Sequence, residues 1–125
     1  MELNEYQKRA MTTCMESSRN YSYMAGNLSA EVGELQGKVN KAQRKEQLVF
    51  NEKGHIVWVG DIEDEITFNE ELKKEAGDVL WQLSGLCSVM GWSLEDVAQM
   101  NLDKLAARKA AGTIVGNGDG IIREK

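Results

Sequence analysis

The stretch Glu70-Glu71-Leu72-Lys73-Lys74-Glu75-Ala76-Gly77-Asp78-Val79-Leu80-Trp81-Gln82-Leu83 has the period of an amphipathic helix. Its apolar residues, and those that follow it, recur at steps of three and four, the pattern of a helix that turns one face to a core. At about 100° per residue, Glu71, Glu75 and Asp78 fall along one edge of that face. We therefore predict a helix over residues 69–90 with carboxylates at the margin of its core face.

A second acidic pair, Glu31 and Glu34, lies in another run with helical period. We predict a helix over residues 27–47 here, with Asn27 or Ser29 as its N-cap. If the two helices pack edge to edge, four carboxylates meet with no histidine among them. Charged groups at a core margin are costly unless they are paired or bind a metal. Ligands that are all oxygen suit Mg²⁺ or Mn²⁺ better than zinc, copper or iron.

The composition describes a single soluble domain that spans residues 1–125, with 42% apolar and 28% charged residues. The net charge of −5 and a pI near 4.9 argue against non-specific binding of nucleic acid. Cys14 and Cys87 lack the spacing of a metal site, so we expect reduced thiols in a cytoplasmic protein. The sequence shows neither a secretory leader nor a run of about 20 apolar residues, so we expect no membrane association.

The rest of the chain is predicted to form further helices, with one interruption at residues 48–68. Proline is absent, which favours a mainly α architecture. We predict a first helix over residues 2–18 and a polar loop over 17–23. Residues 48–68 contain a turn signal and a β-branched, aromatic run, which indicate a short hairpin. The acidic segment 60–65 within this stretch reads as an exposed loop.

The last predicted helix follows Gly91, which ends the helix before it, and opens at Ser93 with a pattern similar to a capping box. Asn101, Lys104 and Arg108 lie on or beside its apolar face, which we expect to face the core. A purely structural helix would carry apolar residues there. These polar residues either form salt bridges with the acidic pairs or clamp phosphate groups.

Together, three spaced motifs resemble the MazG-like all-α nucleoside triphosphate pyrophosphohydrolases: Glu31-x-x-Glu34, Glu75-x-x-Asp78 and Asn101-x-x-Lys104-Leu105-x-x-Arg108. The resemblance covers about residues 27–120. It implies an all-α, four-helix-type bundle that forms dimers or tetramers, here with a hairpin or loop insertion at about 48–68. It also implies Mg²⁺-dependent cleavage of nucleoside triphosphates between the α and β phosphates, which releases monophosphate and pyrophosphate.

The same resemblance implies a role for each site residue. Four side chains would hold the metal: Glu31, Glu34, Glu75 and Asp78. Three would face the phosphates: Asn101, Lys104 and Arg108. Glu31 would accept the proton of the attacking water, although the residues themselves do not rank it above Glu34. Lys104 would add fixed positive charge where negative charge develops during the reaction.

The residue types agree with this chemistry. Hydrolysis of a phosphoanhydride needs charge neutralisation and in-line positioning, and Mg²⁺ supplies both. Aromatic side chains beside such a site are natural platforms for a nucleobase, and the candidates are Tyr21, Tyr23 and Trp58. Residues 48–68 are longer than the equivalent segment of the simplest family members, which leaves the preferred base and sugar open. The tail around Gly116–Asp119 resembles a turn of some members, but we assign no catalytic role to Asp119 or Arg123.

Three other interpretations compete with this one. The carboxylates of the acidic helix edges could form ion pairs with lysines, for example Glu34 with Lys38 one turn away. A di-iron centre requires Glu-x-x-His motifs, and His55 lies outside every predicted helix. A non-catalytic helical oligomerisation or adaptor module with solvated acidic edges remains the alternative function. The apolar stripes over 28–42 and 72–90 are broader than one short helix can cover, so we expect pairing with a second copy.

Overall fold

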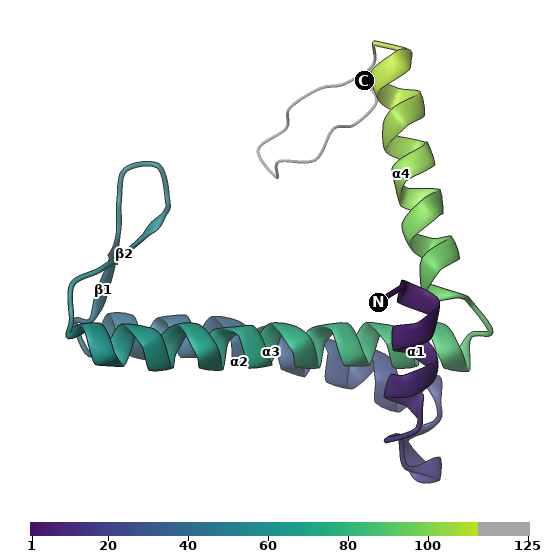
Figure 1. Cartoon of the computed structure of the whole chain (residues 1–125), viewed down its shortest axis with the longest axis horizontal. Coiled ribbons are helices and arrows are strands. Elements are labelled where there is room, and N and C mark those ends of the chain that lie inside the picture. Colours follow the sequence, from purple (N-terminus) through teal and green to yellow (C-terminus); the bar gives the residue numbers. More distant parts are fainter. Residues whose placement is uncertain (113–125) are drawn as a thin grey trace.

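Two long helices, α2 and α3, lie side by side and form the base of the molecule (Figure 1). The computed structural model describes residues 1–112. Its elements are α1 (Leu3–Met11), a 3₁₀ turn (Glu16–Ser18), α2 (Tyr21–Arg44), β1 (Leu48–Phe50), β2 (Ile56–Trp58), α3 (Ile62–Val89) and α4 (Leu94–Ala110). The predicted all-α class is confirmed. The predicted hairpin is present as an antiparallel pair in which Val49 faces Val57.

Helix α2 begins six residues earlier than predicted, because Asn20 is its N-cap. The Asn20 side chain accepts a hydrogen bond of 2.8 Å from the backbone N–H of Tyr23, which satisfies one of the free donors at the helix start. Neither Asn27 nor Ser29 is therefore a cap. Tyr21 and Tyr23 lie in the first turn of a helix and not in the predicted polar loop.

Helix α3 also begins earlier than predicted, at Ile62, and the prediction of an acidic loop over 60–65 is wrong. Glu63, Asp64 and Glu65 form its first turn. Negative side chains are favoured there because the free N–H groups make a helix N-terminus partly positive. Trp58 fixes the start of α3, since its Nε1 donates a hydrogen bond of 2.9 Å to the backbone oxygen of Asp61.

Helix α1 is shorter than predicted and ends at Met11. The hydroxyls of Thr12 and Thr13 donate to the backbone oxygens of Arg9 and Ala10, at 2.6 and 2.7 Å. These bonds satisfy carbonyl groups that the end of a helix leaves without an intrahelical partner. A 3₁₀ turn occupies part of the remaining predicted span, Glu16–Ser18.

The α2–α3 pair is held by apolar contacts near each of its ends. At the hairpin end, Val39, Ala42 and Leu48 are buried and are covered by three partly buried side chains: Trp58, Phe68 and Leu72. At the other end the side chain of Met24 is fully buried and lies over Gly85. Residues 31, 34 and 75 fall between these two contacts. None of the helices within residues 1–112 combines the length and apolarity that crossing a membrane requires.

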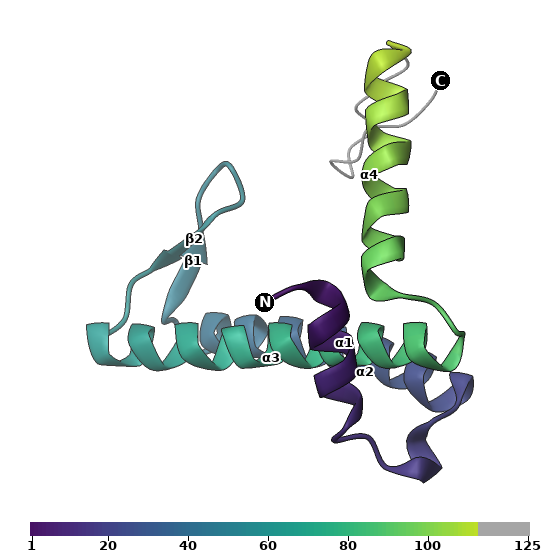
Figure 2. The same ribbon diagram turned by 45° about the vertical axis from the view of Figure 1, so that its right-hand side comes forward.

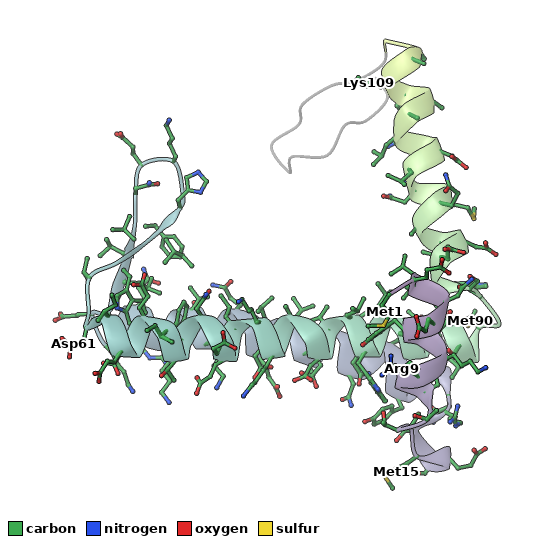
Figure 3. The ribbon with its side chains drawn as sticks, viewed as in Figure 1. Met1, Arg9, Met15, Asp61, Met90 and Lys109 are labelled. Carbon is green, nitrogen blue, oxygen red and sulfur yellow. The ribbon has the colours of Figure 1, made fainter. Side chains whose placement is uncertain are left out.

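Helix α4 leaves the end of α3 and extends away from the α2–α3 pair (Figures 1 and 2). The turn between them is as predicted: Gly91 has φ 74°, and the Ser93 hydroxyl accepts from the N–H of Asp96 at 3.3 Å. Figure 3 shows α3 between its two capping residues, Asp61 and Met90, and α4, which carries Lys109, extending away from α2.

The close approach of α2 and α3 at Gly85 gives a test of this packing. A Cβ atom at Gly85 would overlap Met24 Sδ and lie 2.6 Å from Met24 Cε. We expect Gly85→Ala to lower the free energy of unfolding by about 1–3 kcal/mol, because the enclosed Met24 side chain has little space to move. Gly77 lies in the same helix with nothing within 4 Å of its Cβ position. Gly77→Ala should therefore raise that free energy by about 0.5–1 kcal/mol.

Denaturant titrations of the two variants and the wild type measure both values. If the Gly85 variant were as stable as the Gly77 variant, the close packing of Met24 on Gly85 would be contradicted.

Candidate functional site

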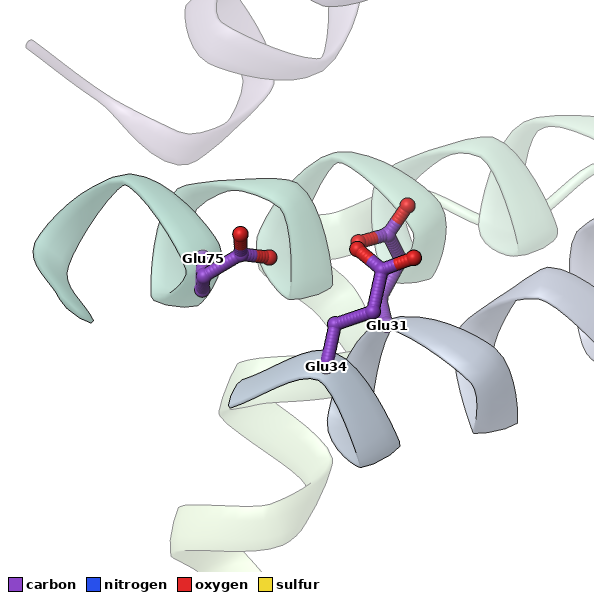
Figure 4. Close-up of side chains that lie close together, drawn as sticks. All are labelled: Glu31, Glu34 and Glu75. Atoms are coloured by element: carbon purple, nitrogen blue, oxygen red, sulfur yellow. The ribbon is translucent and has the colours of Figure 1, made fainter. Parts of the chain in front are cut away.

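Three glutamates meet in the middle of the α2–α3 pair (Figure 4). Glu31 and Glu34 lie one turn apart on α2, and Glu75 lies on α3. One carboxylate oxygen of each lies within 4.8 Å of the others. The helical spacing explains the approach, since residues three apart share a helix face and the two helices run side by side. The structure thus brings together three of the four carboxylates that the sequence pairs predict.

Two oxygens of this carboxylate cluster, Glu31 Oε2 and Glu75 Oε2, are buried and have no hydrogen-bond partner within residues 1–112. Burial raises the pKa of the Glu31 carboxyl above its ordinary value, and the negative charges of Glu34, Asp78 and Glu75 raise it further. A buried carboxylate without a partner is unfavourable. The cluster therefore lacks a positive group, and either a proton or a cation can supply it.

The carboxylate cluster fits a divalent cation that prefers oxygen ligands. Each of the three glutamates offers one carboxylate oxygen, and these oxygens lie close enough together for a single cation to contact all three. His55 is exposed and belongs to the hairpin loop between β1 and β2, so it contributes no nitrogen ligand at this site.

Asp78, the fourth predicted ligand, is exposed and lies outside the group of three. It is nevertheless close enough for its charge to raise the pKa of Glu31. It has the same effect on Tyr6 of α1, whose pKa is raised first by burial and then by Asp78. Tyr6 was not among the predicted site residues. Its helical period predicts that it faces other helices, but nothing in the sequence shows that α1 crosses α3 at this point.

The predicted ion pair between Glu34 and Lys38 does not form. Lys38 pairs instead with Glu71 across the two helices, with Nζ and Oε2 3.5 Å apart. Among residues 1–112, none of the ion pairs contains a member of the carboxylate cluster. The alternative in which lysines neutralise these acidic edges therefore fails for the three clustered glutamates.

The prediction that α4 turns its polar residues toward the core is wrong for this chain. Asn101 and Lys104 are exposed and Arg108 is partly buried, on a helix that extends away from the carboxylate cluster. Trp92, Met100, Asn101 and Lys104 line part of an open cavity of about 740 Å³ beside α4. Periodicity places residues on one face of a helix but does not show what covers that face. The structure therefore does not unite the two halves of the predicted site within one chain.

The aromatic candidates are also separate from the carboxylates. Tyr21 and Tyr23 are 60% and 38% exposed, and Tyr21 lies about 15 Å along α2 from Glu31 at 1.5 Å per residue. Trp58 packs on Phe68 with ring centroids 5.2 Å apart, and it bonds to the start of α3. Its role within the chain is structural.

Comparisons with known proteins found one domain family and one sequence relative. The model of the MazG nucleotide pyrophosphohydrolase domain matches residues 19–112, which includes α2, the hairpin, α3 and α4 and leaves out α1. The chain is 32% identical over 104 residues to the Gene 37 protein of Mycobacterium phage L5, across 83% of this chain and 79% of that relative. No solved structure matches it. With its acidic pairs on two adjacent helices and a family match over most of its length, the chain belongs to the MazG nucleotide pyrophosphohydrolase family.

Proposed function

We propose that this protein hydrolyses ribonucleoside or deoxyribonucleoside triphosphates between the α and β phosphates and releases monophosphate and pyrophosphate. The observation that carries the proposal is the meeting of three glutamates from α2 and α3, with two buried oxygens that lack a partner within the described chain. The family match supports the class of reaction. Substrates of this class carry several negative charges, and an acidic site binds them only through a cation.

Mg²⁺ is the cofactor that we propose, and Mn²⁺ can substitute. Glu31, Glu34 and Glu75 would hold the ion directly, while Asp78 at the margin would complete the ligand set. When bound, Mg²⁺ neutralises the phosphate oxygens and makes a bound water more acidic. The absence of histidine from the cluster favours such hard cations over zinc or iron.

Glu31 is the residue that we propose as general base. In the metal-free chain its pKa is raised first by burial and then by the surrounding carboxylates, and the burial persists when a cation neutralises those carboxylates. A base is most effective when its pKa approaches the working pH. Glu34 is exposed and shares the cluster, and it is the alternative base.

The remaining roles follow the family resemblance. Asn101, Lys104 and Arg108 would bind the phosphates, and Tyr21 or Tyr23 would contact the base. Exposed apolar side chains on the helices, such as Val32 at 49% and Met100 at 71%, favour self-association into a dimer or tetramer. The two free cysteines agree with a cytoplasmic location for a single domain of 125 residues.

The reaction itself is tested by product analysis. With millimolar Mg²⁺, ion-exchange chromatography should show monophosphate and pyrophosphate in equal amounts, and EDTA should abolish both. Glu75→Gln should lower the rate by about 100-fold or more, because the loss of one carboxylate ligand weakens the binding of the cation that stabilises the transition state. Glu52→Gln changes an exposed glutamate of the hairpin loop and is the matched control, with unchanged rate. Diphosphate and orthophosphate as products would contradict the proposal.

The metal site is tested by thermal melts of Glu31→Gln. The folded-state pKa of Glu31 is raised above its ordinary value of 4.5, so its contribution to stability is present below that value and is lost as pH rises through the folded-state pKa. In EDTA at pH 7 we therefore expect the variant to melt at or above the wild-type temperature. This difference should vanish near pH 4.5, where the wild-type carboxyl is protonated.

Added Mg²⁺ should stabilise the wild type far more than Glu31→Gln. Each tenfold loss of affinity removes up to about 1.4 kcal/mol of ligand-dependent stability. Differential scanning calorimetry at both pH values, with EDTA and with Mg²⁺, measures these effects, and Glu52→Gln again serves as control. A variant that melts well below wild type in EDTA at pH 7 would show that the Glu31 carboxylate stabilises the folded chain without a cation, which would contradict the metal site.

A further inference from the structure

One edge of α2 carries carboxylates in its middle and lysines toward its C-terminal end. The two glutamates that α2 gives to the carboxylate cluster are followed, at steps of four, three and four residues, by Lys38, Lys41 and Lys45. Residues at this spacing share one face of a helix. The lysines therefore continue the edge that bears the glutamates, toward the hairpin end of the α2–α3 pair (Figure 1).

The three lysines line a groove of about 240 Å³ between α2 and α3. On the other wall of this lysine groove, α3 contributes Asp64, Thr67 and Glu71. Glu71 lies one turn before Glu75 of the carboxylate cluster, and residues one turn apart are neighbours on a helix. The lysine groove is therefore the continuation of the carboxylate cluster along the same side of the helix pair.

The positive charge of the lysine groove is only partly neutralised by the chain itself. Lys38 forms an ion pair with Glu71, with Nζ and Oε2 3.5 Å apart. Lys41 and Lys45 belong to none of the ion pairs within residues 1–112. If the lysines served only to neutralise α3, they would pair with it. Three ammonium groups face two carboxylates, Glu71 and Asp64, so the groove attracts an anion in a protein whose net charge is −5.

The size and position of the lysine groove suit phosphate groups better than a nucleobase. Sites that enclose a whole small molecule have volumes of about 300–1,000 Å³, and the groove, at about 240 Å³, is smaller and lined mainly by polar side chains. At 1.5 Å per residue, Lys38 lies about 6 Å and Lys41 about 10 Å along α2 from Glu34. Phosphates that reach the carboxylate cluster through a cation would therefore have the next phosphates of the chain beside these two lysines.

We propose that the lysine groove binds the two terminal phosphates of the nucleotide, the part that leaves as pyrophosphate. The inference rests on the proposed function for the identity of this ligand. Water attacks the α phosphorus and gives its proton to the general base, and the bond from that phosphorus to the bridging oxygen breaks. Pyrophosphate leaves with the electron pair, and the ammonium groups of Lys38 and Lys41 stabilise the negative charge that develops on it. Lys38 exchanges Glu71 for a phosphate oxygen.

Binding of inorganic pyrophosphate tests the site without turnover. Isothermal titration calorimetry with Mg²⁺ should show that Lys41→Met weakens binding about tenfold, because one charge-assisted hydrogen bond is lost. Lys73→Met removes the same charge from an exposed position of α3 that does not line the groove, and this matched control should bind as the wild type does. Equal affinities of Lys41→Met and the wild type, or a wild type that binds no pyrophosphate, would overturn the proposal.

Glu71→Gln should have the opposite effect on the same affinity. It releases Lys38 from its ion pair, so pyrophosphate should bind about two- to fivefold more tightly, the range that a partly exposed ion pair contributes. Damage to the fold would weaken binding, so a gain reports on the freed lysine. The control is Glu70→Gln, which breaks the ion pair of 3.8 Å with Lys73 outside the groove and should leave the affinity unchanged. Equal affinities of these two variants would overturn the role of Lys38.

Initial rates separate this inference from the proposed function. Lys41→Met should lower kcat/KM for a nucleoside triphosphate about tenfold or more, and should leave unchanged the affinity for a nucleoside monophosphate, which lacks the two terminal phosphates. A wild type that releases no pyrophosphate, but whose affinity for it falls in Lys41→Met, would contradict the proposed function and support the phosphate site. An active wild type whose kcat/KM and pyrophosphate affinity are unchanged in Lys41→Met would overturn the phosphate site alone.

Discussion

The contact between α2 and α3 is the constraint on which the structure depends. It places Glu31 and Glu34 opposite Glu75, and without a cation these groups repel one another. Apolar packing on both sides of the carboxylates offsets that repulsion, with Met24 over Gly85 at one end and the buried cluster around Leu48 at the other. Apolar contacts on either side of the carboxylate cluster therefore hold α2 and α3 together, and the carboxylates themselves can bind a ligand.

Helical period was enough to place Glu31 with Glu34 on one helix edge and Glu75 with Asp78 on another, because the direction of a side chain follows from its position along a regular helix. That the two edges meet was predicted only on the condition that the two helices pack together, and Asp78 lies outside the group of three. The starts of the helices were less predictable. The start of α2 depends on one hydrogen bond from Tyr23 to Asn20, and neither residue belongs to the apolar pattern. At the start of α3 acidic residues suit an exposed loop and a helix N-terminus equally well, so residues 60–65 were misread.

Tertiary placement limited the prediction of the site. The sequence shows that Asn101, Lys104 and Arg108 share one face of α4, but the direction of that helix depends on contacts with residues almost ninety positions earlier, such as Asn4 with Ser93. The same applies to Tyr6, whose nearness to Asp78 results from the crossing of α1 over α3. Periodicity acts within one element, and these features arise between elements that are distant in the sequence.

The side chain of Gln7 bonds to the Trp92 backbone oxygen and to the Leu94 N–H, and so ties the base of α4 to α1. Helix α4 is about 25 Å long, so a tilt of 10° at its base moves its far end by about 4 Å, more than the length of a hydrogen bond. The side chains of Asn4 and Gln7, in a segment that the family domain does not include, thus help to set the direction of α4. A change in the residues before 19 would therefore alter the direction of α4 without any change in the helices that carry the carboxylates.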